Sequence, residues 1–540
     1  MAKTDKFRFR KHDNIGAADA EGDKFLSKCF VDTGDVEVLL DCADCRSIVV
    51  GRTGSGKTAI LQRIVELEER AIDISPEGLS LSYVSNSTII NYLSNLGVNL
   101  DVFYKLLWRH VFAVELIKRH FKINNDTDLS SFWSRVSDIF RNRKEQNAIK
   151  YLRKWGETFW EETEYRIKEI TNELERAVSA SLGAKYLSLG TSVDVIRKLN
   201  EKQKVEVKQR AQSVINDVQV RQLTDIIDLL DEILEDPQKR YFIVIDRLDE
   251  DWVDDKLRYK LIHALIQCVR DFRKVSHAKI VVAIRLDLLE RVFRLVSVSG
   301  YQEEKYRALY VPLNWKKNNL VQLLDSRIDF LVRSRYTKQK VTHRDLLPRT
   351  VRNEPAIDFI IKRTLMYPRD VILFFNQCIL RSEGQPVLHS KTILAAEGEY
   401  SRLRFKALAD EWAGDYPLLS DFADILKKRK YTFSIKEMRD DEVGEFCLEQ
   451  RISNPTAQDS LSALAKLVAE DVVLTPREFL KNIFMIFYKI GLVALKVESY
   501  DKFISVNSSD RTISSAELSK NTRIRVHAAF HRYLGIRDKN

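Results

Sequence analysis

The amino-acid sequence predicts an α/β fold in which helices flank a mostly parallel sheet. Three short apolar runs rich in β-branched residues have the length of buried strands, at residues 47–50, 241–245 and 279–284. Helical periodicity separates these runs, and strands that alternate with helices assemble into parallel sheets. A glycine-rich segment follows the first run and precedes an amphipathic helix, so the sequence places a ligand-binding turn at the carboxyl end of a strand.

Length and composition describe a folded, multidomain chain. The 540 residues are 44% hydrophobic with only 18 Gly and 10 Pro, which favours about three helix-rich domains. A net charge of +10 permits a polyanionic partner without requiring one. No window approaches the roughly 18 apolar residues of a membrane span, and residues 1–10 are charged where a signal peptide would be apolar. These features predict a cytoplasmic protein with no membrane partner.

The order of the patterns divides the chain into five parts. A polar N-terminal segment, residues 1–24, precedes an α/β core in two pieces. We expect the domain bounds to be 25–85 and 236–314 for the core, 86–235 for a large helical insertion, 315–385 for a helical segment and 386–540 for a C-terminal domain. Within the insertion, Trp133, Trp155 and Trp160 are expected to be packing anchors rather than nucleic-acid platforms.

The C-terminal domain shows an order of elements typical of a winged helix. Residues 474–497 read as one or two apolar helices, 503–506 as a strand and 523–534 as a final helix. His527 and His531 lie four apart on that expected helix, but the glutamate of the protease zinc motif is absent, so we expect a packing or surface role.

The cysteines do not predict a metal site. Of the six, only Cys42 and Cys45 have ligand-like spacing, and one pair cannot close a tetrahedral zinc site. We therefore expect reduced, free thiols, with a redox role or a shared metal as the alternative.

One segment carries a complete phosphate-binding motif. It matches G-x-x-x-x-G-K-[ST] with the residues Gly51, Arg52, Thr53, Gly54, Ser55, Gly56, Lys57 and Thr58. Glycines let the backbone approach phosphates so that N–H groups and a helix amino terminus face the anion. Lys57 would reach the β and γ phosphates, and Thr58 would be a magnesium ligand. The motif predicts a P-loop NTPase core that binds ATP and Mg²⁺.

The second half of such a site is expected after the strand at 241–245. Asp246 ends this strand and would hold magnesium, while Asp249 or Glu250 would activate water. The residue after Asp246 is Arg247, where standard AAA+ ATPases have Glu, which leaves the water-activating carboxylate open. The alternative is a solvated acidic turn in a site that binds nucleotide but hydrolyses it poorly.

The segment at 246–249 resembles the second acidic motif of STAND-class signalling ATPases and of related origin-initiator ATPases. Arg285 ends the next strand, where those families place a polar nucleotide sensor. Residues 310–315 look like the strand and Pro-Leu step before their helical lid. The segment at 367–370 is similar to a sensor-2 motif, which would aim Arg369 at the γ phosphate. An ordinary salt bridge is the alternative at both arginines.

The chain looks most like a group of stand-alone bacterial P-loop ATPases, several of them associated with phage defence. The resemblance implies an α/β P-loop NTPase core with a large helical insertion, a helical lid at 315–385 and a C-terminal winged-helix-like domain. It also implies slow ATP hydrolysis, a nucleotide-dependent switch or sensor, a homo-oligomer and a separate protein effector.

Two other functions remain open from the sequence. Residues 481–540 hold 11 Lys or Arg against 5 Asp or Glu, so the first alternative is a DNA-binding or DNA-remodelling ATPase of initiator type. The same charges could equally form a solvated face. The second alternative is an ATP-binding scaffold without catalysis.

Overall fold

The structure is a computed structural model of the chain. It describes residues 7–77, 100–125, 128–130, 132–133, 143–156, 205, 208–209, 227–296, 304–333, 336, 338–470, 474–506 and 513–537. The chain divides into two compact units. We call them the core unit, formed by Gly34–Arg52 and Lys57–Leu313, and the lid unit, formed by Met1–Thr33, Thr53–Gly56 and Asn314–Asn540.

A five-stranded parallel sheet organises the core unit. Its strands lie in the order β2-β3-β4-β1-β5, and every neighbouring pair is parallel. Their bounds are Ile48–Gly51 for β1, Ala71–Ile74 for β2, Tyr241–Ile245 for β3, Ala278–Arg285 for β4 and Tyr310–Pro312 for β5. The α/β fold with a mostly parallel sheet is therefore confirmed.

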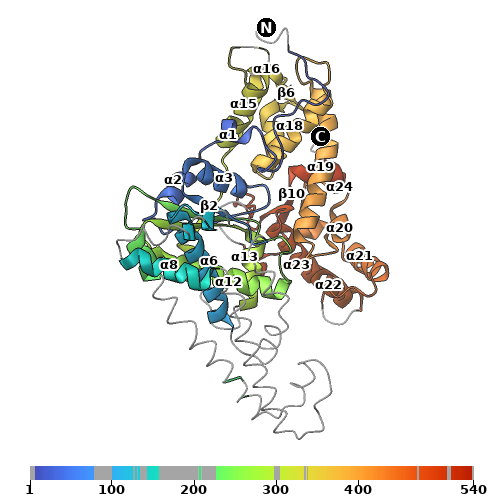
Figure 1. Cartoon of the computed structure of the whole chain (residues 1–540). Coiled ribbons are helices and arrows are strands. Elements are labelled where there is room, and N and C mark those ends of the chain that lie inside the picture. Colours follow the sequence, from blue (N-terminus) through green and yellow to red (C-terminus); the bar gives the residue numbers. More distant parts are fainter. Residues whose placement is uncertain are drawn as a thin grey trace, which may run out of the picture. The chain divides into compact units, whose positions relative to one another are not determined.

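Helices cover both faces of this sheet. Figure 1 shows α2 (Asp35–Leu40) and α3 (Lys57–Leu67) on one side, with α6 (Asp101–His120) and α12 (Asp255–Asp271) on the other. All five residues of β3 are buried, as expected for a strand enclosed on both faces. Among its described residues this unit also contains α8 (Arg143–Trp155), α13 (Leu286–Val296), α14 (Glu304–Arg307) and the 3₁₀ turn η2 (Phe272–Lys274).

Part of the expected insertion packs directly on the sheet domain. Helix α6 runs along α12, and the fully buried Trp108 donates its indole N–H to the Leu261 carbonyl at 2.9 Å. Trp133 packs against the same apolar cluster. The side chain of Trp155, the whole of Trp160 and most of the expected insertion lie outside the described residues.

The first domain of the lid unit is helical, and the N-terminal segment packs against its helices. Phe7 and Phe9 are each 1% exposed, within the same apolar cluster as α15 and α18. Asp23 forms a buried ion pair with Arg327 of α15. The elements are α1 (Leu26–Cys29), α15 (Lys317–Arg333), α16 (His343–Leu346), β6 (Thr350–Val351), β7 (Glu354–Pro355), α17 (Ala356–Lys362) and α18 (Pro368–Leu380).

The lid unit ends in a mixed domain around a second apolar cluster. Its antiparallel sheet has the order β8-β10-β9, and helix α23 leads into β9. This succession of helices and a three-stranded sheet is winged-helix-like. The helices are α19 (Ser390–Trp412), α20 (Leu419–Phe422), α21 (Asp440–Ser453), α22 (Ser460–Ala469), α23 (Pro476–Lys489) and α24 (His531–Leu534); the strands are β8 (Thr432–Ser434), β9 (Val493–Lys496) and β10 (Arg523–Val526). The described part of this domain also contains the 3₁₀ turns η4 (Ala423–Leu426), η5 (Ile435–Glu437), η6 (Ser515–Glu517) and η7 (Ala528–Phe530).

The structure corrects three local predictions in this domain. Residues 493–496 and 523–526 are strands, not helices, and the strand expected at 503–506 is only a bridge between Ile504 and Leu495. In β10 buried and exposed residues alternate, which is the period of a half-buried strand. Four residues are too few to separate that period from the helical pattern that follows. His527 and His531 consequently do not share one helix, since His527 caps η7 by accepting the N–H of Ala529.

The six cysteines are free thiols, as predicted. Among the described residues, no helix combines the length and the apolar character needed to cross a membrane.

Candidate functional site

The phosphate loop joins β1 to α3. Its backbone has positive φ at Gly54 (+82°) and Gly56 (+98°), a region that favours glycine. A Cβ atom on Gly54 would also lie 2.8 Å from the Cβ of Arg369. The glycines are thus required by the turn itself and, at Gly54, by the close approach of another segment.

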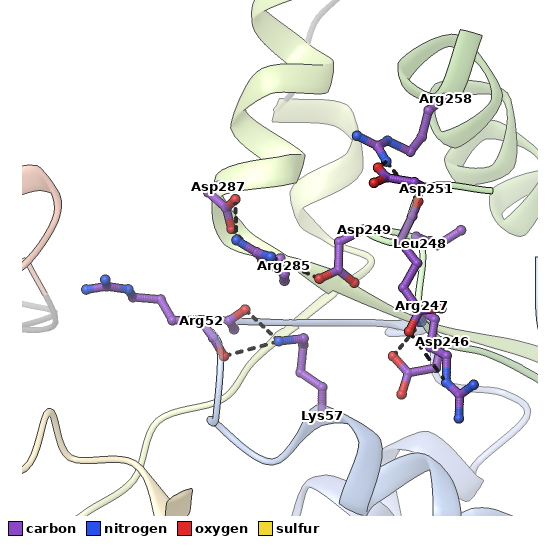
Figure 2. Close-up of polar contacts among 12 residues, drawn as sticks. Arg52, Lys57, Asp246, Arg247, Leu248, Asp249, Asp251, Arg258, Arg285 and Asp287 are labelled. Carbon is purple, nitrogen blue, oxygen red and sulfur yellow. Dashed lines mark hydrogen bonds and ion pairs between the residues drawn. The ribbon is translucent and has the colours of Figure 1, made fainter. Parts of the chain in front are cut away.

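Lys57 opens α3 and turns its ammonium group back over the loop. Its Nζ donates to the carbonyl oxygens of Gly51 at 3.0 Å and Arg52 at 3.1 Å (Figure 2). Thr58 follows in the first turn of α3 and is half-buried. The predicted cation and the predicted magnesium ligand therefore lie together at the helix amino terminus.

Two loop hydroxyls are buried without hydrogen-bond partners among the described residues, Thr53 Oγ1 and Ser55 Oγ. Burying a hydroxyl without a partner costs free energy. Phosphate oxygens and metal-bound water would satisfy such groups, so the loop fits the ligand that its sequence implies.

Asp246 follows β3 and offers one oxygen to a ligand. Its Oδ1 accepts the N–H of Arg247 at 2.9 Å, whereas its Oδ2 is buried and has no hydrogen-bond partner in the described part of the chain. Arg247 has a φ of +59°, so the chain turns sharply directly after the strand. A buried carboxylate oxygen at the carboxyl end of a sheet suits a hard cation such as Mg²⁺. The assignment of Asp246 as a magnesium ligand stays a prediction.

The two candidates for water activation differ in their surroundings. Asp249 Oδ2 accepts from Arg285 Nη1 at 3.0 Å. The Glu250 carboxylate is 52% exposed, with its Oε1 3.9 Å from Arg247 Nε. The next acid, Asp251, is bound by Arg258 (Figure 2). The geometry therefore engages Asp249 in an ion pair, and the choice between Asp249 and Glu250 stays a prediction.

Arg285 ends β4, directly beside Gly51 in the register of the sheet. Because β4 lies between β1 and β3, Arg285 ends its strand between Gly51 and the acidic turn, and Figure 2 shows its guanidinium between the Asp287 and Asp249 carboxylates. It donates to Asp287 through Nε at 3.0 Å and Nη2 at 2.8 Å, besides its contact with Asp249. Burial alone would lower the pKa of Arg285, but the Asp287 and Asp249 carboxylates raise it above its usual value. Arg285 therefore forms the ordinary salt bridges that the sequence analysis gave as the alternative to a nucleotide sensor.

Sequence reasoning gave Asp287 no role. The only available signal was its position two residues beyond Arg285, just after the strand.

Arg369 contacts the apex of the loop within the lid unit. Its backbone N–H donates to the Gly54 carbonyl at 3.4 Å, and its Nε donates to the Ala18 carbonyl at 3.0 Å. Burial, with the nearby charge of Arg404, lowers the pKa of Arg369. No ion pair of Arg369 is found within the residues that the structure covers.

A second lid residue reaches the same apex. Trp315 donates its indole N–H to the Ser55 carbonyl at 2.8 Å. Sequence reasoning placed Trp315 only at the end of the strand that leads into the lid, and no pattern in the sequence indicated this contact.

A glycine-rich loop on a central parallel strand, a lysine at the following helix and a buried acid at the end of a nearby strand define an α/β P-loop NTPase fold. No group of three or more His, Cys, Asp or Glu side chains capable of holding a metal ion occurs among the described residues.

Comparisons with known proteins connect the chain with a family model and with individual proteins. A model described as the FunZ-associated C-terminal helical domain matches residues 318–409, from α15 into α19. The chain is 22% identical over 419 residues to the Escherichia coli (strain K12) protein named "Putative transposon gamma-delta 80.3 kDa protein". That match covers 74% of this chain and 51% of the relative, so the chain spans about half the length of the relative.

Among solved structures, the Walker-type ATPase PABY2304 of Pyrococcus abyssi is similar with a TM-score of 0.37 and 11% identity, over 94% of this chain and 96% of that one. The assignment to the P-loop class therefore rests on the sheet and the loop of the chain itself.

Proposed function

We propose that this chain binds ATP with Mg²⁺ at Gly51–Thr58 and hydrolyses it slowly, as a nucleotide-dependent switch or sensor. The observation that carries the proposal is a complete phosphate loop, whose Gly51, Arg52, Lys57 and Thr58 lie in the core unit, together with the unpartnered, buried Oδ2 of Asp246 at the sheet of that unit. The proposal assigns these two features to the two halves of a triphosphatase site.

Each residue has a separate task in this proposal. The loop N–H groups and Lys57 bind the phosphates, while Thr58 and Asp246 hold Mg²⁺, which neutralises phosphate charge when bound. Asp249 is engaged by Arg285. We therefore favour Glu250 as the carboxylate that orients the attacking water, with Asp249 positioned by its ion pair.

The proposed nucleotide-dependent switch rests on Arg369. The described guanidinium contact of Arg369 is with a neutral carbonyl, so a terminal phosphate would be its first anionic partner among the contacts described. Losing that phosphate on hydrolysis removes the charge that holds the arginine, and the lid can relax. Arg285 already has two carboxylate partners, which favours a role in positioning Asp249.

Four variants test these assignments. Lys57→Ala and Asp246→Asn are expected to lose binding of Mg-ATP in equilibrium dialysis, and Glu250→Gln to keep binding but lose phosphate release. Lys274→Ala, at an exposed lysine of η2, is the matched control for Lys57→Ala. A wild-type chain that binds no ATP with Mg²⁺ at millimolar concentration would sink the proposal. If Asp249→Asn loses phosphate release while Glu250→Gln stays active, Asp249 and not Glu250 is the carboxylate that orients the attacking water.

The wider biological role rests on the resemblance. We propose a homo-oligomer that reports its nucleotide state to a separate protein effector, in bacterial antiviral defence. Light scattering of the ATP-bound and ADP-bound chain tests the oligomer, and a monomer in both states would contradict it.

The DNA-acting alternative has one structural observation in its favour. Arg523 and Arg525 are exposed on β10, Lys496 is the register partner of Arg523, and the Arg525 guanidinium lies 3.7 Å from the centroid of the Phe503 ring. Clustered cations with an aromatic ring can bind phosphates and bases. An ATPase rate that does not change across titrations of duplex and single-stranded DNA, with no DNA binding at low salt, would remove this alternative.

A further inference from the structure

The carbonyl groups at the apex of the phosphate loop are held by lid residues. The Gly54 carbonyl accepts the backbone N–H of Arg369, and the Ser55 carbonyl accepts the indole N–H of Trp315. All four residues belong to the lid unit. We propose that Trp315 is a positioning residue for the phosphate site, which orients the Ser55–Gly56 peptide so that the Gly56 N–H faces the phosphates. This inference rests on the proposed function.

The geometry of the peptide group supplies the first step. A trans peptide is planar, and its C=O and N–H point in opposite directions. A donor that fixes the Ser55 carbonyl therefore also fixes the direction of the Gly56 N–H, away from Trp315. The 2.8 Å distance from Trp315 Nε1 to the Ser55 oxygen is that of a full hydrogen bond.

The second step is the freedom of the loop around this peptide. Glycine adopts many backbone conformations at little cost, and here Gly54 and Gly56 flank Ser55. Rotation of the intervening peptide is therefore resisted mainly by its external contacts. Ser55 Oγ has no hydrogen-bond partner in the described structure, so the carbonyl bond to Trp315 is the polar side-chain contact described for this residue.

The third step is the packing of the indole ring. A Cβ atom on Gly56 would lie 3.8 Å from Trp315 Cζ2 and 4.0 Å from Pro368 Cγ, which is ordinary van der Waals contact. The ring consequently packs beside Gly56 while its N–H donates to the Ser55 carbonyl. Trp315→Phe removes the donor and keeps an aromatic ring at this position, with a smaller contact area, and Trp108→Phe makes the same change in ring size elsewhere.

The position of the peptide predicts which nucleotides are affected. Loop N–H groups bind mainly the α and β phosphates, which ATP and ADP share. Loss of the orienting hydrogen bond should lower the affinities for ATP and ADP by the same factor. We expect a factor of about threefold to tenfold, which corresponds to the free energy of one typical hydrogen bond. Arg369→Ala should lower the affinity for ATP more than the affinity for ADP, since Arg369 is proposed to bind the terminal phosphate.

Trp108→Phe provides a matched control. Trp108 also donates its indole N–H to a backbone carbonyl, Leu261 at 2.9 Å, but it lies in α6 and not at the loop. Affinities of the full-length chain for Mg-ATP and Mg-ADP are measured by calorimetry, with melting temperature and steady-state rates alongside. For Trp315→Phe we expect both dissociation constants and KM to rise about threefold to tenfold with kcat kept, and for Trp108→Phe only a lower melting temperature.

Two results would overturn the inference. One is a folded Trp315→Phe chain whose dissociation constants match those of the wild type, and the other is an equal loss of affinity in Trp108→Phe. A wild-type chain that binds neither nucleotide would overturn the proposed function itself, which is a different outcome.

A second measurement follows the indole N–H of the wild-type chain directly. The wild-type chain, labelled with ¹⁵N at tryptophan indoles, is titrated with inorganic pyrophosphate, and the Trp315 signal is the one absent from the Trp315→Phe spectrum. A shift of that signal on binding supports the inference, and an unchanged signal at saturation contradicts it.

Discussion

Removing Arg404 tests how the start of α18, which carries Arg369, is held in place. Arg404 of α19 donates through Nη1 to Asp370 Oδ1 at 2.8 Å, and Asp370 Oδ2 accepts the N–H of Leu365 at 2.7 Å. The two side chains are 4% and 1% exposed. Arg404→Met keeps an unbranched apolar stem but removes the guanidinium, which leaves the Asp370 carboxylate buried without its cation.

The expected loss of stability is large because the pair is buried. Removing one partner of a buried ion pair costs about 3–5 kcal/mol, since the other charge stays uncompensated. In a domain of this size that corresponds to a fall in Tm of roughly 6–20 °C. The same helix offers a control, Arg402, whose ion pair with Glu399 is exposed to solvent and should contribute little to stability.

Thermal unfolding followed by circular dichroism compares Arg404→Met with Arg402→Met. The double variant Asp370→Asn, Arg404→Met should recover part of the loss, because it removes the orphaned charge. We also expect weaker ATP binding in Arg404→Met at a temperature where it is folded, since Asp370 adjoins Arg369. If Arg404→Met melts within about 2 °C of Arg402→Met, a shift worth less than roughly 1 kcal/mol, the reasoning is refuted.

Two further predictions concern the loop and the core. Gly54→Ala places a side chain at a φ of +82° and a Cβ 2.8 Å from that of Arg369. We therefore expect backbone strain of about 1–3 kcal/mol and an ATP affinity that is lower by at least roughly fivefold. Calorimetry measures this affinity, and an unchanged value would contradict the prediction. Burial lowers the pKa of His110, hydrogen-bonded to Tyr151, from 6.5 to about 3. Because the folded state resists protonation, stability present above about pH 6.5 is lost as pH falls towards 3, by up to about 1.4 kcal/mol per pH unit. His110→Asn should flatten the fall of Tm with pH over this range, and an unchanged slope would count against the assignment.

The sequence by itself determined the elements whose chemistry is local. The phosphate loop is contained in eight consecutive residues, so its glycines, lysine and threonine could be assigned without knowing the fold. Asp246 could equally be singled out from the sequence, because it directly follows a recognisable buried strand. Strands separated by helices were enough to predict the parallel sheet.

The tertiary structure alone decided the contacts between distant segments. Arg285 and Asp249 lie 36 residues apart, and they meet because β4 lies beside β3 in the sheet. Trp315 reaches Ser55 across 260 residues. Strand β10 is too short to be recognised by its own period and is defined by its pairing with β8 and β9. In each case the deciding interaction depends on a partner far away in the chain, whereas the phosphate loop carries its own hydrogen-bonding groups within one turn.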